Sequence, residues 1–494
     1  MISMERTKLD CGERVIMKTD LLFDTFGIKE FRGNQELIIK HVIGGKNALV
    51  IMPTGMGKSI CFQFPALVLQ GTCIVISPLI ALMKDQVDSL LQKGISATYI
   101  NSSLNRTERT KRYEELRAGK LKILYVSPER FQKKEFLEAL SKLQISLLAI
   151  DEAHCISQWG HDFRPDYTKF KWFREILKFP PTIALTATAS SRVQNDIINQ
   201  MGLKSQEIQV FNDGLFRPNL HLSVTECIDV ETKYKHLLEE LKSKKGVSIL
   251  YFSLIQELEN FSRWLDTKRF PHLVYHGKRS NQDRSVTLTK FLQSDSAVLL
   301  ATNAFGMGVD KQNVRNVFHV QIPGSIEAYY QEIGRAGRDA KPSECKLFYT
   351  EDDLAIQMDF IDWQNPDVSY LKKLYLLLSQ KQNQLSALDY ETIQSFMTYK
   401  NKSDHRVQTA INLLSRVGLV SGDLEQGTLQ LENEWDDALF SKEELEAKKM
   451  EGGKRLYQML QYTKTNDCRR KFIHQYFDSP FTSCGNCDLC LKSD

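Results

Sequence analysis

The stretch NALVIMPTGMGKSICF, residues 47–62, decides how this chain is organised. A short apolar run leads into a glycine-rich loop, and the loop opens a second apolar segment with helical character. In such a strand–loop–helix unit, glycines let backbone N–H groups curl around phosphates, and the helix N-terminus favours their negative charge. The pattern predicts a nucleotide-binding loop made of Pro53, Thr54, Gly55, Met56, Gly57, Lys58 and Ser59.

Two side chains of this loop have specific expected roles. Lys58 should reach the β- and γ-phosphates, and the Ser59 hydroxyl should ligate Mg²⁺. The strict form of the loop has a glycine where this chain has Met52, whereas TGMGKS (54–59) is intact. The loop therefore predicts that the chain binds ATP together with Mg²⁺.

Apolar, β-rich runs recur along the chain as far as residue 350, and a helix-like segment follows each of them. The runs are TCIVIS (72–77), KILYVS (122–127), SLLAID (146–151), TIALTA (182–187), SILYFS (248–253), AVLLAT (297–302), NVFHVQI (316–322) and CKLFYT (345–350). This alternation is typical of buried parallel sheets with crossover helices. We expect an α/β protein with two parallel-sheet domains in tandem, over residues 1–210 and 211–350.

Composition restricts the class of protein. Hydrophobic residues make up 42% and charged residues 26% of the chain, which is ordinary for a soluble protein. No apolar run approaches the ~18 residues that a transmembrane helix needs, so no membrane partner is expected. Residues 1–18 carry charges where a signal peptide has an apolar core, which predicts a cytosolic protein. The net charge of +4 says little about partners.

A pair of carboxylates follows the apolar run 146–151. Asp151 and Glu152 open the tetrapeptide DEAH (151–154). Because parallel strands end at one edge of a sheet, this pair should lie beside the phosphate-binding loop. Asp151 is expected to hold Mg²⁺ through its water shell, and Glu152 to orient and deprotonate the attacking water. An Asp-Glu pair after a strand can also be a plain helix start; the loop upstream favours the catalytic interpretation.

The segment QEIGRAGR (331–338) lies in the second domain and supplies Gln331, Arg335 and Arg338. Hydrolysis needs cations opposite the γ-phosphate, and arginine suits this role because its charge is permanent and its donors form a fork. With a spacing of three, the two arginines are expected to share a helix face. They would then act on ATP in a cleft between the domains. The alternative is an ordinary surface pair held in ion pairs.

After residue 352 the strand-like runs stop and helical periodicity takes over. Residues 367–445 are predicted to form three helices and a short hairpin, with the third helix at 403–418 and the hairpin at 419–432. Three small helices followed by a hairpin suit a winged helix. An ordinary helical subdomain is the alternative.

Four of the ten cysteines lie close to the C-terminus. Cys468, Cys484, Cys487 and Cys490 have the spacing C-x15-C-x2-C-x2-C. Four thiolates suit a closed tetrahedral Zn²⁺ site, and disulfides are disfavoured in a reducing cytosol. Clustered redox-active thiols are a poorer fit. We therefore predict a structural zinc site.

Taken together, these motifs resemble those of superfamily 2 helicases, and specifically the RecQ family of DNA helicases. SPLIALMKDQV (77–87), YVSPER (125–130), LTATAS (185–190) and ATNAFGMGVDK (301–311) match further motifs of the family. The resemblance covers about residues 20–365 and about 446–490. It implies two RecA-like domains, ATP-driven 3′→5′ translocation with unwinding of duplex DNA, and work in DNA repair and recombination.

FRGNQ (31–35) resembles the adenine-binding motif of this family. The resemblance implies that Gln35 reads the adenine edge and that Arg32 assists. Many members carry an aromatic residue at the position of Ile28, so a plain apolar contact with adenine is expected here instead of stacking.

SQWGHDFRPDY (157–167) is similar to the family's aromatic-rich loop, which senses single-stranded DNA and relays its presence to ATP hydrolysis. Trp159 and Phe163 would offer stacking surfaces, and Arg164 would contact phosphate or form a cation–π pair. His154 would link the nucleotide state to these DNA contacts. Aromatic side chains in a loop can also be core plugs.

The order of the C-terminal elements departs from the family pattern, in which the zinc ligands precede the winged helix. Here residues 351–366 and 446–494 resemble the family's helical hairpin and zinc-binding module, and the winged-helix-like segment 367–445 is inserted between them. The chain ends soon after its last cysteine and resembles short members without the HRDC domain.

The expected partners are single-stranded DNA and duplex or forked DNA, contacted mostly at phosphates. Ser77, Asn101 and Arg406 are further candidate contacts. The resemblance points to a monomer in the bacterial cytoplasm, associated with the nucleoid, with single-strand-binding or recombination proteins as possible partners. Two alternatives stay open: an RNA helicase, and a DNA-binding switch that hydrolyses ATP without separating strands.

Overall fold

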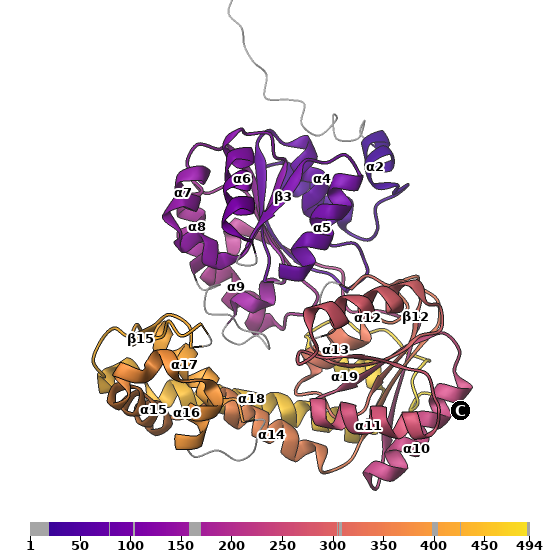
Figure 1. Cartoon of the computed structure of the whole chain (residues 1–494). Helices are drawn as coiled ribbons and strands as arrows, with labels where there is room; N and C mark the ends of the chain where they lie inside the picture. The colour runs from indigo at the N-terminus through magenta and orange to yellow at the C-terminus, as the bar shows by residue number, and fades with distance from the viewer. Residues whose placement is uncertain are drawn as a thin grey trace, which may run out of the picture.

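The structure is a computed structural model that describes residues 19–491, apart from 79, 102–103, 158–168, 304, 306–308, 398–403 and 425. Figure 1 shows two α/β domains and a helical region. The first domain lies at the top and the second at the lower right. The helical region extends to the lower left along two paired helices, α14 (Asp353–Gln364) and α18 (Lys442–Lys464).

In the described part of the first domain, seven parallel strands have the order β3-β4-β2-β5-β6-β1-β7. The strands are β1 (Asn47–Ile51), β2 (Thr72–Ile76), β3 (Ala97–Ile100), β4 (Ile123–Val126), β5 (Ile145–Ile150), β6 (Thr182–Thr186) and β7 (Ile208–Asn212). Helices cover both faces, so the central strands are apolar on both sides. The helices are α2 (Thr19–Phe26), α3 (Gln35–Ile43), α4 (Ile60–Val68), α5 (Ile80–Gln92), α6 (Arg106–Arg117), α7 (Lys134–Leu140), α8 (Phe170–Ile176) and α9 (Ser191–Gln200).

The second domain repeats this plan: its described residues form six parallel strands in the order β10-β11-β9-β12-β13-β8. The strands are β8 (Leu220–Glu226), β9 (Val247–Phe252), β10 (Leu273–Tyr275), β11 (Val298–Thr302), β12 (Val314–His319) and β13 (Ser343–Tyr349). The helices are α10 (Val230–Ser243), α11 (Ile255–Thr267), α12 (Asn281–Gln293) and α13 (Ile326–Ile333). The predicted fold class, two RecA-like parallel-sheet domains in tandem, is confirmed.

The sheet order of the first domain brings its functional loops together. Strands β1 and β5 flank β6, so the glycine-rich loop after β1 and the acidic pair after β5 end at the same edge. Two backbone hydrogen bonds continue the sheet beyond the strands: Met52 N donates to Thr186 O at 3.0 Å, and Asp151 N donates to Ile76 O at 2.9 Å. Parallel sheets place ligand sites at this carboxyl edge.

Helices α14 and α18 carry the inserted segment between them. Gly452 allows their close packing, because a Cβ atom there would lie 3.3 Å from a side-chain carbon of Ile361. The insertion comprises α15 (Val368–Gln380), α16 (Tyr390–Phe396), α17 (Arg406–Arg416) and a hairpin of β14 (Val420–Ser421) and β15 (Gln430–Leu431). It has an apolar core of its own. In the described part of the insertion, three α-helices precede the hairpin, which is the order that the sequence predicted.

The zinc-binding module packs onto the second sheet as part of the same core. Cys487 is fully buried and forms a β-bridge with Leu222 of β8. Arg470, in α19 (Arg469–Tyr476), donates hydrogen bonds to the carbonyl oxygens of Arg217 and Leu220. No helix in the described part of the chain is both long and apolar enough to cross a membrane.

Candidate nucleotide, metal and nucleic-acid sites

The phosphate-binding loop connects the end of β1 to α4. Gly55 and Gly57 both have φ of +82°, a left-handed conformation that favours glycine. The loop curls so that Lys58 Nζ donates a hydrogen bond to the Met52 carbonyl oxygen at 3.2 Å. Burial lowers the pKa of Lys58, and the neighbouring acidic pair opposes that shift. The loop therefore holds a partly buried cation next to its backbone N–H groups, which fits a bound triphosphate.

The acidic pair lies beside this loop at the carboxyl end of β5. Burial, and then the nearby Glu152, raise the pKa of Asp151 to about 7, while Lys58 acts in the opposite direction. A partly buried carboxyl whose pKa is raised gains from a cation partner, so its chemistry fits Mg²⁺. Glu152 has φ of 49°, which is uncommon outside glycine, and its N–H donates to Asp151 Oδ1 at 3.0 Å. Left-handed non-glycine residues cluster at functional sites.

His154 connects the acidic pair to the neighbouring strand. Its Nδ1 atom lies 3.4 Å from Glu152 Oε2 and 3.1 Å from Thr186 Oγ1. Thr186 ends β6, and its hydroxyl donates to the Thr188 carbonyl oxygen at 3.1 Å. The segment after β6 is therefore tied to Glu152 through one buried histidine.

The second domain reaches the loop directly. A Cβ atom on Gly55 would lie 3.0 Å from Arg338 Cγ. The Thr54 hydroxyl donates to the Gly334 carbonyl oxygen at 2.9 Å, and Arg217 Nη1 donates to the Thr54 carbonyl oxygen at 3.2 Å. Arg217 was not predicted as a functional residue, because only the apposition of the two domains brings it to the loop.

The two arginines of QEIGRAGR have different surroundings. The expectation that they share a helix face is wrong: α13 ends at Ile333, and Gly337 turns the chain with φ of +54°. Arg338 lies against the loop and also donates to Asp310 Oδ1 at 2.7 Å. Gln331 and Arg335 instead line a cavity of about 570 Å³ between the second domain and the paired helices.

The two predicted adenine contacts, Gln35 and Arg32, have different surroundings. Gln35 is buried, and its Nε2 donates to the carbonyl oxygens of Met56 at 2.8 Å and Gly57 at 3.2 Å. Its Oε1 accepts from the backbone N–H of Arg32 at 2.8 Å, whereas the Arg32 side chain is exposed. Gln35 thus stabilises the conformation of the phosphate-binding loop through hydrogen bonds to its backbone.

The predicted nucleic-acid contacts are less exposed than expected. The side chains of Ser77 and Asn101 are buried. Arg406 forms an ion pair with Asp404 at 2.6 Å and lies over the ring of Tyr370. Trp159, Phe163 and Arg164 lie outside the described residues.

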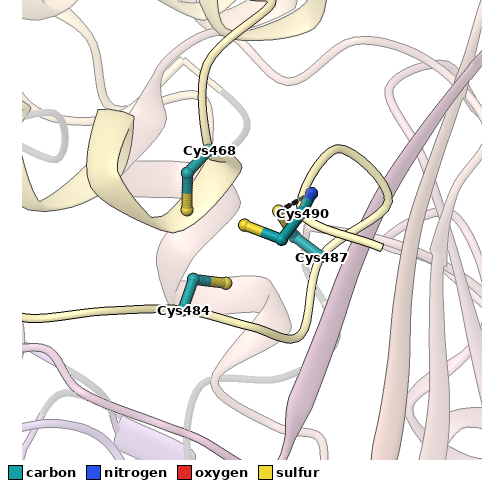
Figure 2. A group of neighbouring side chains, drawn as sticks. All are labelled: Cys468, Cys484, Cys487 and Cys490. Carbon is teal, nitrogen blue, oxygen red and sulfur yellow. Dashed lines mark hydrogen bonds between the residues drawn. The ribbon is translucent and has the colours of Figure 1, made fainter. Parts of the chain in front are cut away.

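The four predicted cysteines converge, and all their Sγ atoms lie within 4.8 Å of one another (Figure 2). A tetrahedral Zn²⁺ with Zn–S bonds of ~2.3 Å needs sulfur atoms ~3.8 Å apart, so this donor set fits zinc. Backbone N–H groups of Lys471, Asn486 and Cys490 lie 3.4–3.5 Å from three of the sulfurs, a geometry that favours thiolates.

Family models match three parts of the chain. They are a DEAD/DEAH box helicase model at residues 32–197, a helicase conserved C-terminal domain model at 232–340 and a RecQ zinc-binding model at 422–491. The fold also matches solved helicases. Yeast Dbp5 bound to RNA and ADP BeF3 has a TM-score of 0.55 at 16% identity over 69% of this chain and 89% of that one. The helicase MrfA bound to DNA has a TM-score of 0.56 at 15% identity over 85% and 62%. The fold and the site thus define a helicase core with two RecA-like domains.

Curated relatives narrow this class. ATP-dependent DNA helicase RecQ of Pasteurella multocida is 41% identical over 76% of this chain and 57% of its own length. RecQ of Bacillus subtilis is 43% identical over 69% and 58%. The probable ATP-dependent DNA helicase RecS of Bacillus subtilis is 39% identical over 70% and 69%. The chain belongs to the RecQ family of helicases. It spans little more than half the length of the first two relatives.

Membership of this family identifies the metal and the cofactors that the chain binds. The four-cysteine cluster is the zinc site of the RecQ zinc-binding module. The domain with the phosphate-binding loop matches the DEAD/DEAH helicase model, so ATP and Mg²⁺ are its cofactors.

Proposed function

We propose that this chain is an ATP-dependent DNA helicase that translocates 3′→5′ and unwinds duplex DNA in repair and recombination. The observation that carries the proposal is the contact of Arg338 in the second domain with Gly55 in the first. ATP bound at the loop would touch both domains, so its binding and hydrolysis would change how they are apposed. Repeated closure and opening can drive a two-domain motor along a strand.

The site residues have distinct roles in this proposal. Bound Mg²⁺ would offset the charge of the phosphate oxygens, with Ser59 and Asp151 as its protein contacts. Lys58 would neutralise the β- and γ-phosphates. Glu152 would accept a proton from the attacking water, and Arg338 would meet the charge that develops on the γ-phosphate.

Other candidate residues would act less directly. Gln331 and Arg335 would contact the nucleotide only after further closure of the cleft. Gln35 and Arg32 would recognise adenine. For this, the Gln35 amide would give up a hydrogen bond to a carbonyl oxygen of the loop and form one with the base instead.

DNA contact would be mainly electrostatic and independent of sequence. Ser77 and Asn101 are buried, so they would act by fixing the backbone at the carboxyl edge of the first sheet. Trp159, Phe163 and Arg164 would sense single-stranded DNA. Contacts to phosphates make such binding strongly dependent on salt.

The insertion would approach duplex DNA with α17 rather than with its hairpin. His405 and Arg416 lie at the two ends of this helix, and Arg406, which pairs with Asp404, is its first residue. The hairpin carries Asp423 near its tip, which suits a phosphate backbone poorly.

Unwinding of labelled duplexes with a 3′ tail, a 5′ tail or no tail tests this function. ATP-dependent strand separation on the 3′-tailed duplex alone is the expected result. Turnover of ATP without separation would support a DNA-binding switch, and stronger stimulation of ATPase by RNA than by DNA would support an RNA helicase. The Lys58→Ala variant is the control for contaminating helicases.

The proposal extends to organisation and location. We infer functional units at 1–210, 211–350, 351–366 with 446–494, and 367–445. We infer a monomer in the bacterial cytoplasm, associated with the nucleoid and working beside single-strand-binding or recombination proteins.

A further inference from the structure

The first domain also meets the C-terminal region away from the nucleotide cleft, at the N-terminus of α9. The backbone N–H of Ser191 donates to Asp478 Oδ2 at 3.3 Å, and Arg192 Nη1 donates to Glu451 Oε2 at 3.2 Å. Glu451 lies in the middle of α18, and Asp478 lies between α19 and the zinc ligand Cys484. Two separate elements therefore each bring one carboxylate to the same helix end.

The charges at this contact are complementary. A helix N-terminus carries partial positive charge, so acidic groups are favoured there, and Arg192 adds a full charge. The Arg192 side chain is 53% exposed and that of Glu451 is 19% exposed. Ion pairs this open to solvent are weak and sensitive to salt. Such a contact can form and break repeatedly without a large barrier.

The α9 helix is firmly attached to the segment that carries Glu152. The Ser157 hydroxyl donates to Asp196 Oδ2 of α9 at 2.7 Å. The helix packs against the 3₁₀ turn Ala153–Ile156, which directly follows Glu152. Its apolar face joins the core of the first domain. A shift of α9 would therefore change the position of Glu152 in the acidic pair.

We propose that Arg192, Glu451 and Asp478 are positioning residues for ATP hydrolysis. They hold α9 against α18 and the zinc-module loop when the domains are apposed, and through α9 they set the orientation of Glu152. The rate of hydrolysis then depends on the position of α18 and the zinc-module loop relative to the first domain. This inference rests on the proposed function, in which Glu152 is the base.

A double-mutant cycle tests the pair in the full chain. Arg192→Ala and Glu451→Ala should each lower the kcat of DNA-stimulated ATPase about threefold, as expected for a partly exposed ion pair. The double variant should be slower by clearly less than the product of the two single effects, because the two substitutions share one interaction. The KM for ATP, the zinc content and the melting temperature should stay unchanged. Lys235→Ala, which breaks the exposed Lys235–Glu231 pair of the second domain, is the matched control.

Asp478→Asn tests the second half of the contact. Asp478 has φ of 51°, which asparagine tolerates, so this variant should fold. It should lower kcat without lowering zinc content, because it weakens the hydrogen bond that the Ser191 N–H donates to the side chain of residue 478. If kcat of all three single variants equals that of Lys235→Ala, or if the double variant is about ninefold slower, the proposal is overturned.

A measurement without hydrolysis separates this inference from the proposed function. Small-angle scattering with the ATP analogue AMP-PNP should show compaction of the wild-type chain and less compaction of Arg192→Ala. A wild-type chain without DNA-stimulated ATPase would refute the proposed function. Equal compaction of wild type and variant would refute the positioning role even in an active enzyme.

Discussion

The zinc site and the nucleotide cleft are built in opposite ways. All four zinc ligands fall within residues 468–490, and one of them belongs to the buried core of the second domain. The nucleotide cleft joins residues far apart in sequence: Thr54 and Gly334, which share a hydrogen bond, are 280 positions apart and lie in different domains.

This difference teaches which part of the molecule can move. Metal binding contributes directly to folding when the ligands form part of the core, so the zinc module should open only on unfolding. The cleft is held by single polar contacts such as those of Thr54, Gly334 and Arg217. Contacts of this kind contribute ~1 kcal/mol each, so nucleotide can govern whether the cleft is closed.

The largest expected effect comes from breaking the zinc site. Cys487→Ser replaces a fully buried ligand that also bridges to β8. Structural zinc contributes on the order of 10 kcal/mol to folding, so zinc should be lost and the second domain should unfold. Metal analysis and thermal melting measure both effects. Cys227→Ala, a buried cysteine outside the cluster, should keep about one zinc per chain; equal zinc loss in both variants would contradict the assignment.

The next largest effect should come from substituting the arginines that the second domain contributes to the nucleotide cleft. Arg338→Ala should lower the kcat of ATP hydrolysis by ~10³-fold, as for arginines that face the γ-phosphate in other ATPases. Arg335→Ala should cost less, because Arg335 faces the cavity instead of the loop. Single-turnover ATPase measures both. A greater loss in Arg335→Ala would show that the active cleft differs from the one described.

Substitutions at the first-domain residues of the cleft should affect ATP binding and ATP hydrolysis differently. Glu152→Gln should keep the proposed Mg²⁺ contact of Asp151 but remove the proposed base, so kcat should fall ~10²-fold or more while ATP still binds. Lys58→Ala removes the cation of the phosphate-binding loop, so ATP affinity should fall ~10- to 100-fold. Calorimetric titration with AMP-PNP compares the two. Equal loss of affinity would remove the distinction between their roles.

The smallest effect on the motor should come from the insertion, which neither site includes. Deleting 367–445 and joining α14 to α18 through a short flexible linker should keep zinc and DNA-stimulated ATPase, because the insertion has its own core. Unwinding of forked duplex should fall several-fold. Wild-type unwinding on forked, tailed and junction substrates would indicate another role, such as partner docking.

The sequence predicted the centre of each sheet but not its edges. Every apolar run became a strand, whereas β3, β7, β8 and β10 were not predicted. These four strands are the two edges of each sheet. An edge strand is covered less completely than a central one, as the partly exposed residues of β10 show. Its sequence therefore lacks the continuous apolar run that marks a central parallel strand.

The candidate sites divide in the same way. The loop at Lys58, the pair at Asp151 and the cysteine cluster are local patterns, and the structure brings the members of each together. Contacts across the domains, such as that of Arg217 with Thr54, leave no local pattern. The helix-face expectation for Arg335 and Arg338 failed because spacing alone did not reveal that the helix ends at Gly334 and that the chain turns at Gly337.

The length of α18 has a mechanical consequence. At 1.5 Å per residue, its 23 residues extend about 35 Å from the insertion to the zinc module. If it turned by about 10° about its C-terminal end, next to the zinc module, its far end would travel about 6 Å, or nearly two base-pair steps of duplex DNA at about 3.4 Å each. The helix would then act as a lever that converts small rotations near the second domain into movements on the scale of single base pairs.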